Sequence, residues 1–413
     1  MNAPNPMFRP ILAVVVLVCV VSAARAQSTP SAPPLPDRGS RTVPVSTVAQ
    51  LQQAVSQLSS DTTIVLRPGT YRLTSTLYVR GNLRNVAIRG ATDNREDVVI
   101  VGGGMGNPSG GVPFGLWTGE GIDGVTIANL TIRDFSQHAI ILNPATRRPH
   151  LYNLRLLDVG DQFVKGNPDA AGNGVDDGVL EHSVVEYTTT APDSYSNGID
   201  IHAGQNWIVR RNTFRNIVSP PGQALMGPAI LFWNRAGNTI TEGNVLINCA
   251  RGISYGMSDR PGVNDHTGGI IRNNIVFRSA TQGGDVGIHV ADSPDTQVLN
   301  NTVVLSGTYP FAIEYRYPSS ARLMIVNNLV DGAVQLRDGA TATVRNNVTR
   351  VTAAMFVDIT TGDLHLSAAA TEAIDTGLAE MNVPDDVDGR PRPLGTAYDV
   401  GADEYEPRSI GDL

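Results

Sequence analysis

The chain has 413 residues, of which 42 are glycine, 26 are proline and 6% are aromatic, and its formal net charge is −8. This composition is typical of a turn-rich chain long enough to bury one extended core of small β-branched side chains. The negative charge argues against nucleic acid as a partner, so an acidic ligand would depend on local arginine and lysine side chains. The sequence contains no phosphate-binding loop, zinc-type cysteine cluster or dinucleotide fingerprint.

Residues 1–26 have the pattern of a secretory signal. A basic residue precedes an apolar run at 11–21, and small residues follow up to Ala26. The run is too short to span a membrane, so we predict cleavage after Ala26 and a secreted or periplasmic chain without a membrane anchor. A lipoprotein is the alternative, because Cys19 lies in the run. After cleavage Cys249 is the remaining cysteine, and we expect a core residue there rather than a disulfide.

The following segments predict a spacer and a covered first coil. Residues 27–44 are rich in proline and serine, so we expect a tether. Residues 47–58 have the amphipathic pattern of a short helix capped by Ser46, and residues 61–73 predict the first strand with a tight turn at 68–69. Such a helix would cover the strand edges that a solenoid exposes at its first coil.

A short phrase, asparagine between β-branched residues, recurs along most of the chain. The steps between its markers range from 19 to 32 residues, which is the length of one coil of a parallel β-solenoid. Asparagine suits the bend of a coil because its side chain tolerates left-handed backbone, and stacked amides can bond to one another. The predicted markers are Asn129, Asn153, His182, Asn212, Asn244, Asn274, Asn301, Asn328 and Asn347.

A second apolar phrase follows each marker after roughly ten residues, and it predicts another strand of the coil. Strand alternation places the following residues inside: Ile140, Val164, Ile199, Ile230, Ile253, Ile288, Ile313 and Val334. The fold class is therefore all-β, with the parallel β-solenoid over residues 45–352. Beyond residue 352 the repeat fades, and the glycine and proline spacing of residues 353–413 predicts a folded C-terminal cap and tail.

Three features together resemble secreted bacterial right-handed parallel β-helix proteins of the pectate-lyase-like superfamily. They are IVLRPGTYRL (64–73), the asparagine-marked coils and the DVDGRPRP…YDVGADEY segment (386–405), so that the resemblance covers residues 45–405. The resemblance implies a right-handed, single-stranded β-helix. It implies a substrate cleft on the outer face of the sheet that contains VKGN (164–167). Fold does not fix activity here, because the superfamily includes lyases, hydrolases, epimerases, esterases and adhesins.

One composition feature selects a candidate centre on that sheet. Lys165 is the only lysine among 31 lysine and arginine residues, and it falls on an outward position. A lysine can lose its proton when it is desolvated, whereas an arginine does so far less readily. Coils stack about 4.8 Å apart, so Asp200 and His202 from the next coil are expected to contact Lys165. A lone surface lysine in a solvated position is the simpler alternative.

The same outward row predicts a substrate-binding surface several sugar units long. The Trp233 ring could pack against the apolar face of a pyranose ring, and the guanidinium of Arg316 or Arg337 could bind a carboxylate through two hydrogen bonds. The alternative for Trp233 is an aromatic side chain packed under a loop. The alternative for Glu314 and Arg316 is a solvated ion pair. The predicted binding residues are Asn167, Trp233, His289, Glu314, Arg316 and Arg337.

The chemistry that these residues favour is cleavage of a uronate-containing polysaccharide by β-elimination. Such a lyase needs a base for the C5 proton, an acid for the leaving oxygen and a group that neutralises the carboxylate. We assign Lys165 or His202 as the base, with Asp200 in the same catalytic set, and Arg316 or a calcium ion as the neutraliser. The pattern resembles alginate lyase and chondroitinase B-like lyases, in which an Arg-His-Gly follows the strand lysine one coil later. Here IDIHAG (199–204) supplies the histidine but no arginine.

Two other functions stay open. A glycoside hydrolase would need paired carboxylates, and Asp200 is about 19 Å from Glu314 by the stacking rise, so a loop carboxylate would have to join it. A non-catalytic β-helix that binds a glycan or a surface partner is the third hypothesis.

The expected partners and ions follow from the same residues. We expect an acidic or neutral polysaccharide as the partner, no nucleic acid, and a monomer. No cofactor is required, although Asp176 and Asp177 from a loop could join Asp200 in a calcium site. Long loops at 167–178, 188–198, 219–228 and 256–269 should form the cleft wall, with Asp265 and His266 as ordinary loop polarity.

Overall fold

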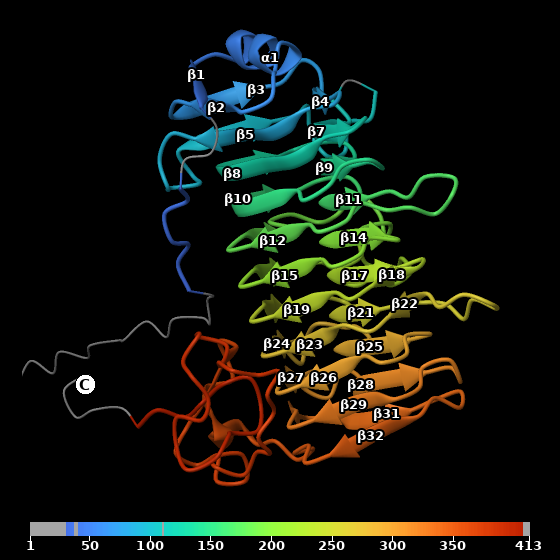
Figure 1. The fold of residues 1–413 in the computed structure, drawn as a ribbon. Coiled ribbons are helices and arrows are strands. Elements are labelled where there is room, and N and C mark those ends of the chain that lie inside the picture. The colour runs from blue at the N-terminus through green and yellow to red at the C-terminus, as the bar shows by residue number, and fades with distance from the viewer. Residues whose placement is uncertain (1–29, 37–39, 110, 408–413) are drawn as a thin grey trace, which may run out of the picture.

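The computed structural model describes residues 30–36, 40–109 and 111–407, so the predicted signal segment lies outside the described residues. The chain winds into a parallel β-helix in which strands of successive coils pair in register (Figure 1). The all-β parallel solenoid predicted from the repeats is confirmed. Within the described ranges, no helix has both the length and the apolar character needed to cross a membrane.

Twenty strands of the described chain form the larger sheet, which provides two faces of each coil. They are β1 (Arg41–Val45), β2 (Thr62–Leu66), β3 (Gly69–Arg72), β5 (Arg84–Gly90), β6 (Val98–Val101), β8 (Asp123–Arg133), β10 (His150–Leu157), β12 (Val179–Glu181), β13 (Val184–Glu186), β15 (Ile208–Arg210), β16 (Thr213–Arg215), β19 (Ile240–Glu242), β20 (Val245–Ile247), β23 (Ile270–Arg272), β24 (Ile275–Phe277), β26 (Gln297–Leu299), β27 (Thr302–Val304), β29 (Leu323–Val326), β30 (Leu329–Val330) and β32 (Ala342–Arg345).

Ten further strands of the described residues form a second sheet, which we call the ten-stranded sheet. They are β4 (Leu77–Arg80), β7 (Phe114–Gly119), β9 (His138–Leu142), β11 (Val164–Gly166), β14 (Ile199–His202), β17 (Ile230–Trp233), β21 (Ile253–Tyr255), β25 (Ile288–Ala291), β28 (Phe311–Arg316) and β31 (Ala333–Leu336). The smaller elements are β18 (Ala236–Gly237) with β22 (His266–Thr267), β33 (Phe356–Asp358) with β34 (Asp363–Leu366), α1 (Val48–Ser56) and the 3₁₀ helix η1 (Ala353–Met355).

The core runs along the inside of the β-helix. The predicted inward residues of the ten-stranded sheet from Ile140 to Ile313 are buried, and Val334 in the last strand is partly buried. Cys249 is a buried free thiol, as expected, and burial raises its pKa to about 12. The alternation of the strands therefore fixes which side chains face outward, and these carry the candidate site.

The asparagine markers occupy two adjacent rows rather than one. In the coils from Asn212 to Asn328 the marker is buried, and its Nδ2 donates to Oδ1 of the next marker, at 3.0 Å for Asn212 to Asn244 and 2.9 Å for Asn244 to Asn274. The ladder continues to Asn347. Each amide also bonds to a backbone carbonyl, for example that of Val209, so these buried polar groups are paired.

The other row is the left-handed bend, one residue earlier in each coil. It contains Asn129, Asn153 and His182, with φ of 55°, 48° and 54°, and Asn153 Nδ2 donates to Asn129 Oδ1 at 2.9 Å. The predicted left-handed bend is therefore present at these three markers, and the prediction was wrong for the later markers, which follow the bend by one residue. The later members of this row are Arg211, Gly243, Asn273, Asn300, Asn327 and Asn346. Glycine and asparagine suit a positive φ, which explains much of this row.

The first coil is covered as predicted, with two corrections. Helix α1 packs Leu51 and Val55 onto the end of the β-helix (Figure 1), and its cap is Thr47, which accepts a bond from the Gln50 N–H, rather than Ser46. The predicted tether ends earlier than residue 44, because β1 pairs with β2 in parallel. Residues 30–36 also lie against the larger sheet, where the Leu35 carbonyl accepts from Arg89.

The C-terminal segment does not cap the end of the β-helix. Its apolar residues, among them Leu364 and Ala402, pack onto Ile275, Phe277 and Leu329 on the outer side of the larger sheet (Figure 1). We call residues 353–407 the C-terminal flank. The bend row binds the flank through side-chain amides, since Asn273, Asn300, Asn327 and Asn346 donate to flank carbonyls.

Candidate active site

The register of the ten-stranded sheet aligns the predicted polar side chains. Lys165 in β11 pairs with Asp200 in β14, and His202 at the end of β14 pairs with Trp233 in β17. The outward row then continues through Leu231, Ser254 and His289 to Glu314. Parallel pairing without a shift in these strands keeps the outward positions in line, so the predicted row is present.

Lys165, Asp200 and His202 form one hydrogen-bonded cluster, which we call the lysine cluster. Lys165 Nζ lies 2.5 Å from Asp200 Oδ2 and 2.8 Å from His202 Nε2. The other carboxylate oxygen, Oδ1, accepts from the indole N–H of Trp233 at 2.8 Å. The His202 and Trp233 rings lie 4.5 Å apart between centroids. An amine, an imidazole and a carboxylate thus share protons in one place.

The charge of Asp200 is fixed by its partners. Burial alone raises the pKa of this carboxyl, but the hydrogen bond to His202 and the positive charge of Lys165 outweigh it and hold the pKa below its ordinary value. The side-chain amide of Asn234 lies 3.3 Å from Nδ1 on the opposite edge of His202. Asp200 is therefore a buried carboxylate that accepts hydrogen bonds from Lys165 and Trp233.

A loop residue that the sequence did not reveal completes the surroundings of the cluster. Arg260 lies over Trp233, with 5.4 Å between Cζ and the ring centroid, and its Nε donates to the buried Asp265. Asp265 also accepts from the backbone N–H groups of Met257 and Asn234, at 2.7 and 2.6 Å. The prediction of Asp265 as ordinary loop polarity was wrong, because this carboxylate organises the loop that places Arg260.

His266 was mispredicted in the same way. It is fully buried between the hydroxyls of Thr239 and Ser293, each at 2.8 Å, and burial lowers its pKa to about 3. It is a neutral core histidine rather than a loop residue.

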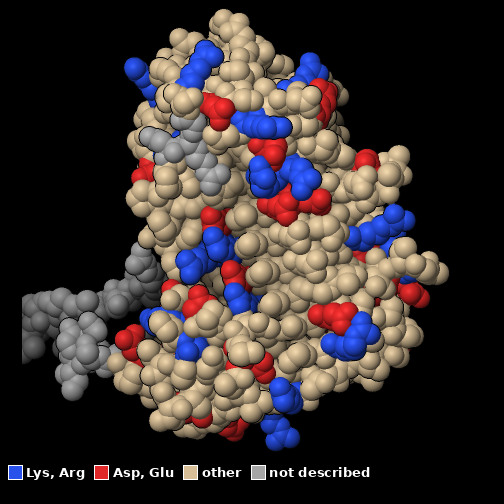
Figure 2. Space-filling model, viewed as in Figure 1, with Lys and Arg blue, Asp and Glu red and all other residues tan. Residues whose placement is uncertain are grey.

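A groove of about 520 Å³ lies beside Asn234 and Arg260. Its walls include residues 168–170 and Gly172 from one long loop and residues 259–261 and Val263 from another, with Arg235 between them. Two of the four loops predicted to frame the outward row, 167–178 and 256–269, therefore meet at this groove, and Asn234 and Arg260 connect it to the lysine cluster. On the face shown in Figure 2, basic and acidic side chains are interspersed, so that charge recognition must be local.

A second polar cluster lies further along the same sheet, and we call it the glutamate cluster. The buried Glu314 carboxylate binds Arg337 Nη1 through both oxygens, at 3.1 and 3.2 Å, and lies 3.6 Å from Arg316 Nε. His289 Nε2 lies 3.8 Å from it, and burial followed by the charge of Arg316 lowers the pKa of His289 to about 4. These residues line a pocket of about 150 Å³ together with Asp285.

The two clusters serve different parts of the surface. Four strand spacings separate Asp200 from Glu314, which is about 19 Å. Arg316 also binds Asp338 at 2.6 Å. The prediction that Arg316 neutralises a carboxylate at Lys165 is therefore wrong, because its guanidinium lies several coils away, whereas Arg260 lies beside the lysine cluster.

The remaining predicted residues bind partners outside the lysine cluster. Asn167 follows β11 on the side of His202, and its Nδ2 donates to Asn143 at 3.0 Å. Asp176 accepts from the Gln205 N–H, and Asp177 faces Arg147 at 3.6 Å.

The structure does not bring Asp176, Asp177 and Asp200 together as the predicted calcium site, because each of them binds other partners. Lys165 and Trp233 already occupy both oxygens of Asp200. Among residues 30–36, 40–109 and 111–407, one group of three His, Cys, Asp or Glu side chains has ligand atoms within 4.8 Å of one another. That group lies in the C-terminal flank and not at Asp200.

The comparisons with known proteins agree on the fold. Residues 197–368 match a family model described as right handed beta helix region. Among solved structures, the chain is similar to an alginate lyase from Paenibacillus sp. str. FPU-7, with 16% identity and a TM-score of 0.53 over 75% of this chain and 98% of that chain. A search of curated proteins gave no match.

Two further structures extend the comparison to other activities. The pectate lyase Pel9A is 14% identical, with a TM-score of 0.50 over 89% of this chain and 97% of that one. A structure titled glycoside hydrolase is 10% identical, with a TM-score of 0.56 over 78% and 95%. Similarity at this level of identity shows the fold and leaves the activity to the residues of the site. The chain thus has a right-handed parallel β-helix fold.

Proposed function

We propose that the protein is a polysaccharide lyase that cleaves a uronate-containing glycan by β-elimination at the lysine cluster. The observation that carries the proposal is the contact of Lys165 with both Asp200 and His202, at 2.5 and 2.8 Å, on an outward sheet face beside a groove. An exposed, purely structural ion pair would not require an imidazole as a second partner of the amine.

The hydrogen bond between Lys165 and His202 offers a route to a reactive base. Transfer of one proton from Nζ to Nε2 leaves a neutral amine beside an imidazolium, and Asp200 Oδ1 lies 3.5 Å from that imidazolium. The neutral amine takes the C5 proton of the uronate, and the imidazolium gives its proton to the departing glycosidic oxygen. Lys165 then ends as an ammonium and His202 as a neutral ring, so one proton transfer restores the reactive pair.

The geometry of the pair also favours one stereochemical course. The base and the acid lie 2.8 Å apart on the same outward face of the ten-stranded sheet, so both would reach the sugar from the same side. This favours syn elimination, in which the C5 proton and the leaving oxygen are on the same side of the ring.

Removal of the C5 proton needs a neutralised carboxylate, and the position of Arg260 supports that role for it. Its guanidinium lies over Trp233, and Trp233 donates to Asp200. The guanidinium is therefore at the edge of the lysine cluster. Arginine binds carboxylates through two parallel hydrogen bonds. A calcium ion brought by the substrate is the alternative neutraliser, and calcium dependence stays a prediction.

The glutamate cluster would bind a more distant part of the same polymer. Arg316 and Arg337 are held beside Glu314 several coils from Lys165, where they would meet another acidic sugar unit. We also infer that the protein acts outside the cytoplasm, as the pattern of residues 1–26 indicates.

The test is an assay of the purified mature protein on alginate, pectate, chondroitin and dermatan, with and without Ca²⁺. A lyase produces ultraviolet absorbance from the new C=C bond, and Lys165→Ala should abolish it. If neither ultraviolet absorbance nor new reducing ends appeared with any polymer, the enzyme hypothesis would be wrong and a non-catalytic glycan-binding protein would be favoured.

A glycoside hydrolase is the second candidate, and the glutamate cluster favours it. Asp285 and Glu314 both line the pocket of about 150 Å³, which brings two carboxylates to one cavity, as hydrolases require. New reducing ends without absorbance, lost in Glu314→Gln but retained in Lys165→Ala, would establish this alternative.

A further inference from the structure

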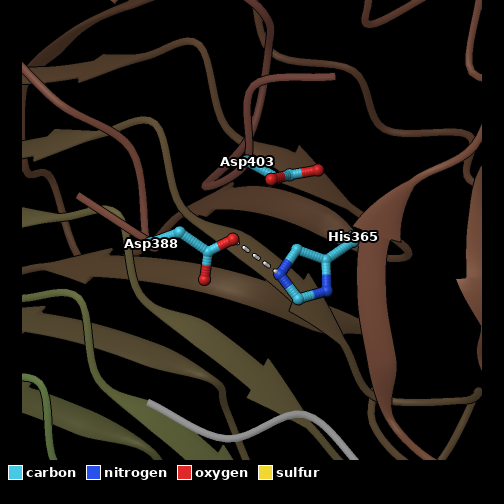
Figure 3. Close-up of side chains that lie close together, drawn as sticks. All are labelled: His365, Asp388 and Asp403. Carbon is cyan, nitrogen blue, oxygen red and sulfur yellow. Dashed lines mark hydrogen bonds and ion pairs between the residues drawn. The ribbon is translucent and has the colours of Figure 1, made fainter. Parts of the chain in front are cut away.

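Three side chains of the C-terminal flank converge at a point that neither the fold nor the lysine cluster uses. His365 comes from β34, Asp388 from the turn at 386–390 and Asp403 from the segment that follows Pro393. Figure 3 shows them around a common space, and His365 Nε2 lies 3.1 Å from Asp388 Oδ2. The three ligand atoms lie within 4.8 Å of one another, as atoms bound to a single metal ion do.

A fourth side chain, the carboxylate of Asp363, orients the imidazole. His365 Nδ1 donates to Asp363 Oδ1 at 2.6 Å, which leaves Nε2 directed at Asp388. Histidine ligands of metal ions usually donate their other ring N–H to a carboxylate or a carbonyl in this way. Asp363 is two residues away on the same strand, so its side chain lies on the same face of β34 as that of His365.

Asp403 provides an independent sign of a missing ligand. Its side chain is 3% exposed, and Oδ2 accepts from the Leu366 N–H at 2.7 Å. The other oxygen, Oδ1, is buried and has no hydrogen-bond partner among the described residues. Its ion-pair partner is Arg390, whose Nη1 lies 3.7 Å away and donates no hydrogen bond to it. A buried carboxylate oxygen without a hydrogen bond is costly, and this one lies at the point where His365 and Asp388 meet.

The charges around this point are also out of balance. Arg390 Nη1 lies 3.3 Å from Asp388, 3.7 Å from Asp403 and 3.8 Å from Asp386, and Asp388 also binds His365. With Asp363 at His365 and Glu406 at Arg390 included, five carboxylates of the described flank surround one guanidinium and one imidazole.

We propose that His365, Asp388 and Asp403 bind a divalent first-row metal ion, with Zn²⁺ as the best fit. The donor set has one imidazole nitrogen and two carboxylates, which suits zinc, whereas Ca²⁺ takes six to eight oxygen ligands. The ion fills the space next to Asp403 Oδ1, which accepts no hydrogen bond, and adds positive charge to this acidic cluster. Its role is structural, because it joins β34 to the turn at 386–390 and to the chain around Asp403.

The site lies on the flank and not on the ten-stranded sheet, so it does not depend on the proposed lyase activity. It fastens a segment that packs on the side of the β-helix through two apolar clusters and the amides of the bend row. The loss of the metal should therefore loosen the flank first.

Zinc binding is measured by titration calorimetry on the full mature chain after dialysis against a chelator, and by thermal unfolding with and without Zn²⁺. We expect about one equivalent of Zn²⁺ and a rise in Tm of roughly 4 °C at a hundredfold excess over Kd. Asp403→Asn and His365→Gln should each abolish both effects. Asp363→Asn should weaken binding about 10- to 100-fold without abolishing it, because it acts through His365.

Matched variants test whether zinc uptake belongs to these three residues. Asp375→Asn changes a flank carboxylate whose Oδ1 accepts from the N–H groups of Thr396 and Ala397, and it should leave zinc uptake unchanged. His202→Gln should also leave it unchanged. No uptake by the wild type, or uptake that survives both Asp403→Asn and His365→Gln, would overturn the proposal, as would uptake lost in His202→Gln.

The competing structure is a metal-free ionic cluster. Burial lowers the pKa of His365, but Asp363 and Asp388 outweigh it and raise that pKa to about 10. A protonated ring would then hold the two carboxylates by itself. In that case the wild type would take up no zinc, and its Tm would not respond to the ion.

Discussion

The lysine cluster and the glutamate cluster lie on the same sheet face and differ in what their protons can do. In the lysine cluster an amine, an imidazole and a carboxylate lie in direct contact, so a proton can move between Lys165 and His202. In the glutamate cluster the carboxylate is held by arginines, which keep their protons, and His289 is neutral. Two clusters on the same β-helix face therefore differ in function: the lysine cluster is suited to proton transfer, and the glutamate cluster is suited to binding a charged ligand.

The largest expected effect is on the lysine cluster. Lys165→Arg keeps the charge and the contact with Asp200 but removes a group that can lose its proton, so kcat should fall about 10³- to 10⁴-fold. Steady-state kinetics on the preferred polymer measures the change. Arg337→Lys is the matched control in the glutamate cluster, and it should change KM more than kcat. A Lys165→Arg variant with near-normal kcat would remove Lys165 from the base role.

The second effect is on the stability of the glutamate cluster. Glu314→Gln leaves Arg337 and Arg316 beside a neutral amide, and breaking a buried ion pair costs about 3 to 5 kcal/mol. Urea unfolding should show this loss. Asp338→Asn removes the exposed partner of the same Arg316 and should cost less than about 1 kcal/mol. Equal losses in the two variants would show that burial of Glu314 does not matter.

The third effect tests which arginine serves the lysine cluster. Arg260→Gln should raise KM for a uronate polymer about 10-fold or more, since a charged hydrogen-bonded pair contributes about 1.5 to 3 kcal/mol. Arg316→Gln should raise it less, because that guanidinium lies several coils from Lys165. If Arg316→Gln raised KM more than Arg260→Gln, the carboxylate of the substrate would be bound at the glutamate cluster instead.

The repeats of the sequence predicted the coil interior and the outward row because strand alternation is local. The contact of Lys165 with Asp200 and His202 was predictable because in-register parallel strands place equivalent residues side by side. The asparagine markers were harder to assign. From Asn273 onward two asparagines stand together in each coil, so the sequence alone does not tell the bend row from the ladder.

Arg260 and the C-terminal flank could not be predicted in this way. Arg260 owes its position to Asp265, whose buried carboxylate binds several backbone N–H groups of an irregular loop. No periodicity in the sequence marks such a loop. The flank was expected at the end of the β-helix because the repeat fades there, but its apolar side chains fit the side of the larger sheet.

The smallest effect is a pH dependence that belongs to the glutamate cluster. Burial and the charge of Arg316 lower the pKa of His289 from 6.5 to about 4 in the folded chain. Between those values the unfolded chain binds a proton that the folded chain does not, so stability is complete above pH 6.5 and is lost as the pH falls toward 4. One such group costs about 1 kcal/mol between pH 6.5 and 5.5. His289→Gln should remove this part of the slope.

Buried carboxyls such as Asp399, whose pKa is raised by burial to about 6, titrate in the opposite sense. The informative quantity is therefore the difference between the unfolding free energies of His289→Gln and the wild type at each pH. A difference that stays constant from pH 7 to pH 5 would mean that His289 takes up its proton in the folded state. The glutamate cluster would then hold a mobile proton as the lysine cluster does, and the contrast between the two clusters would no longer hold.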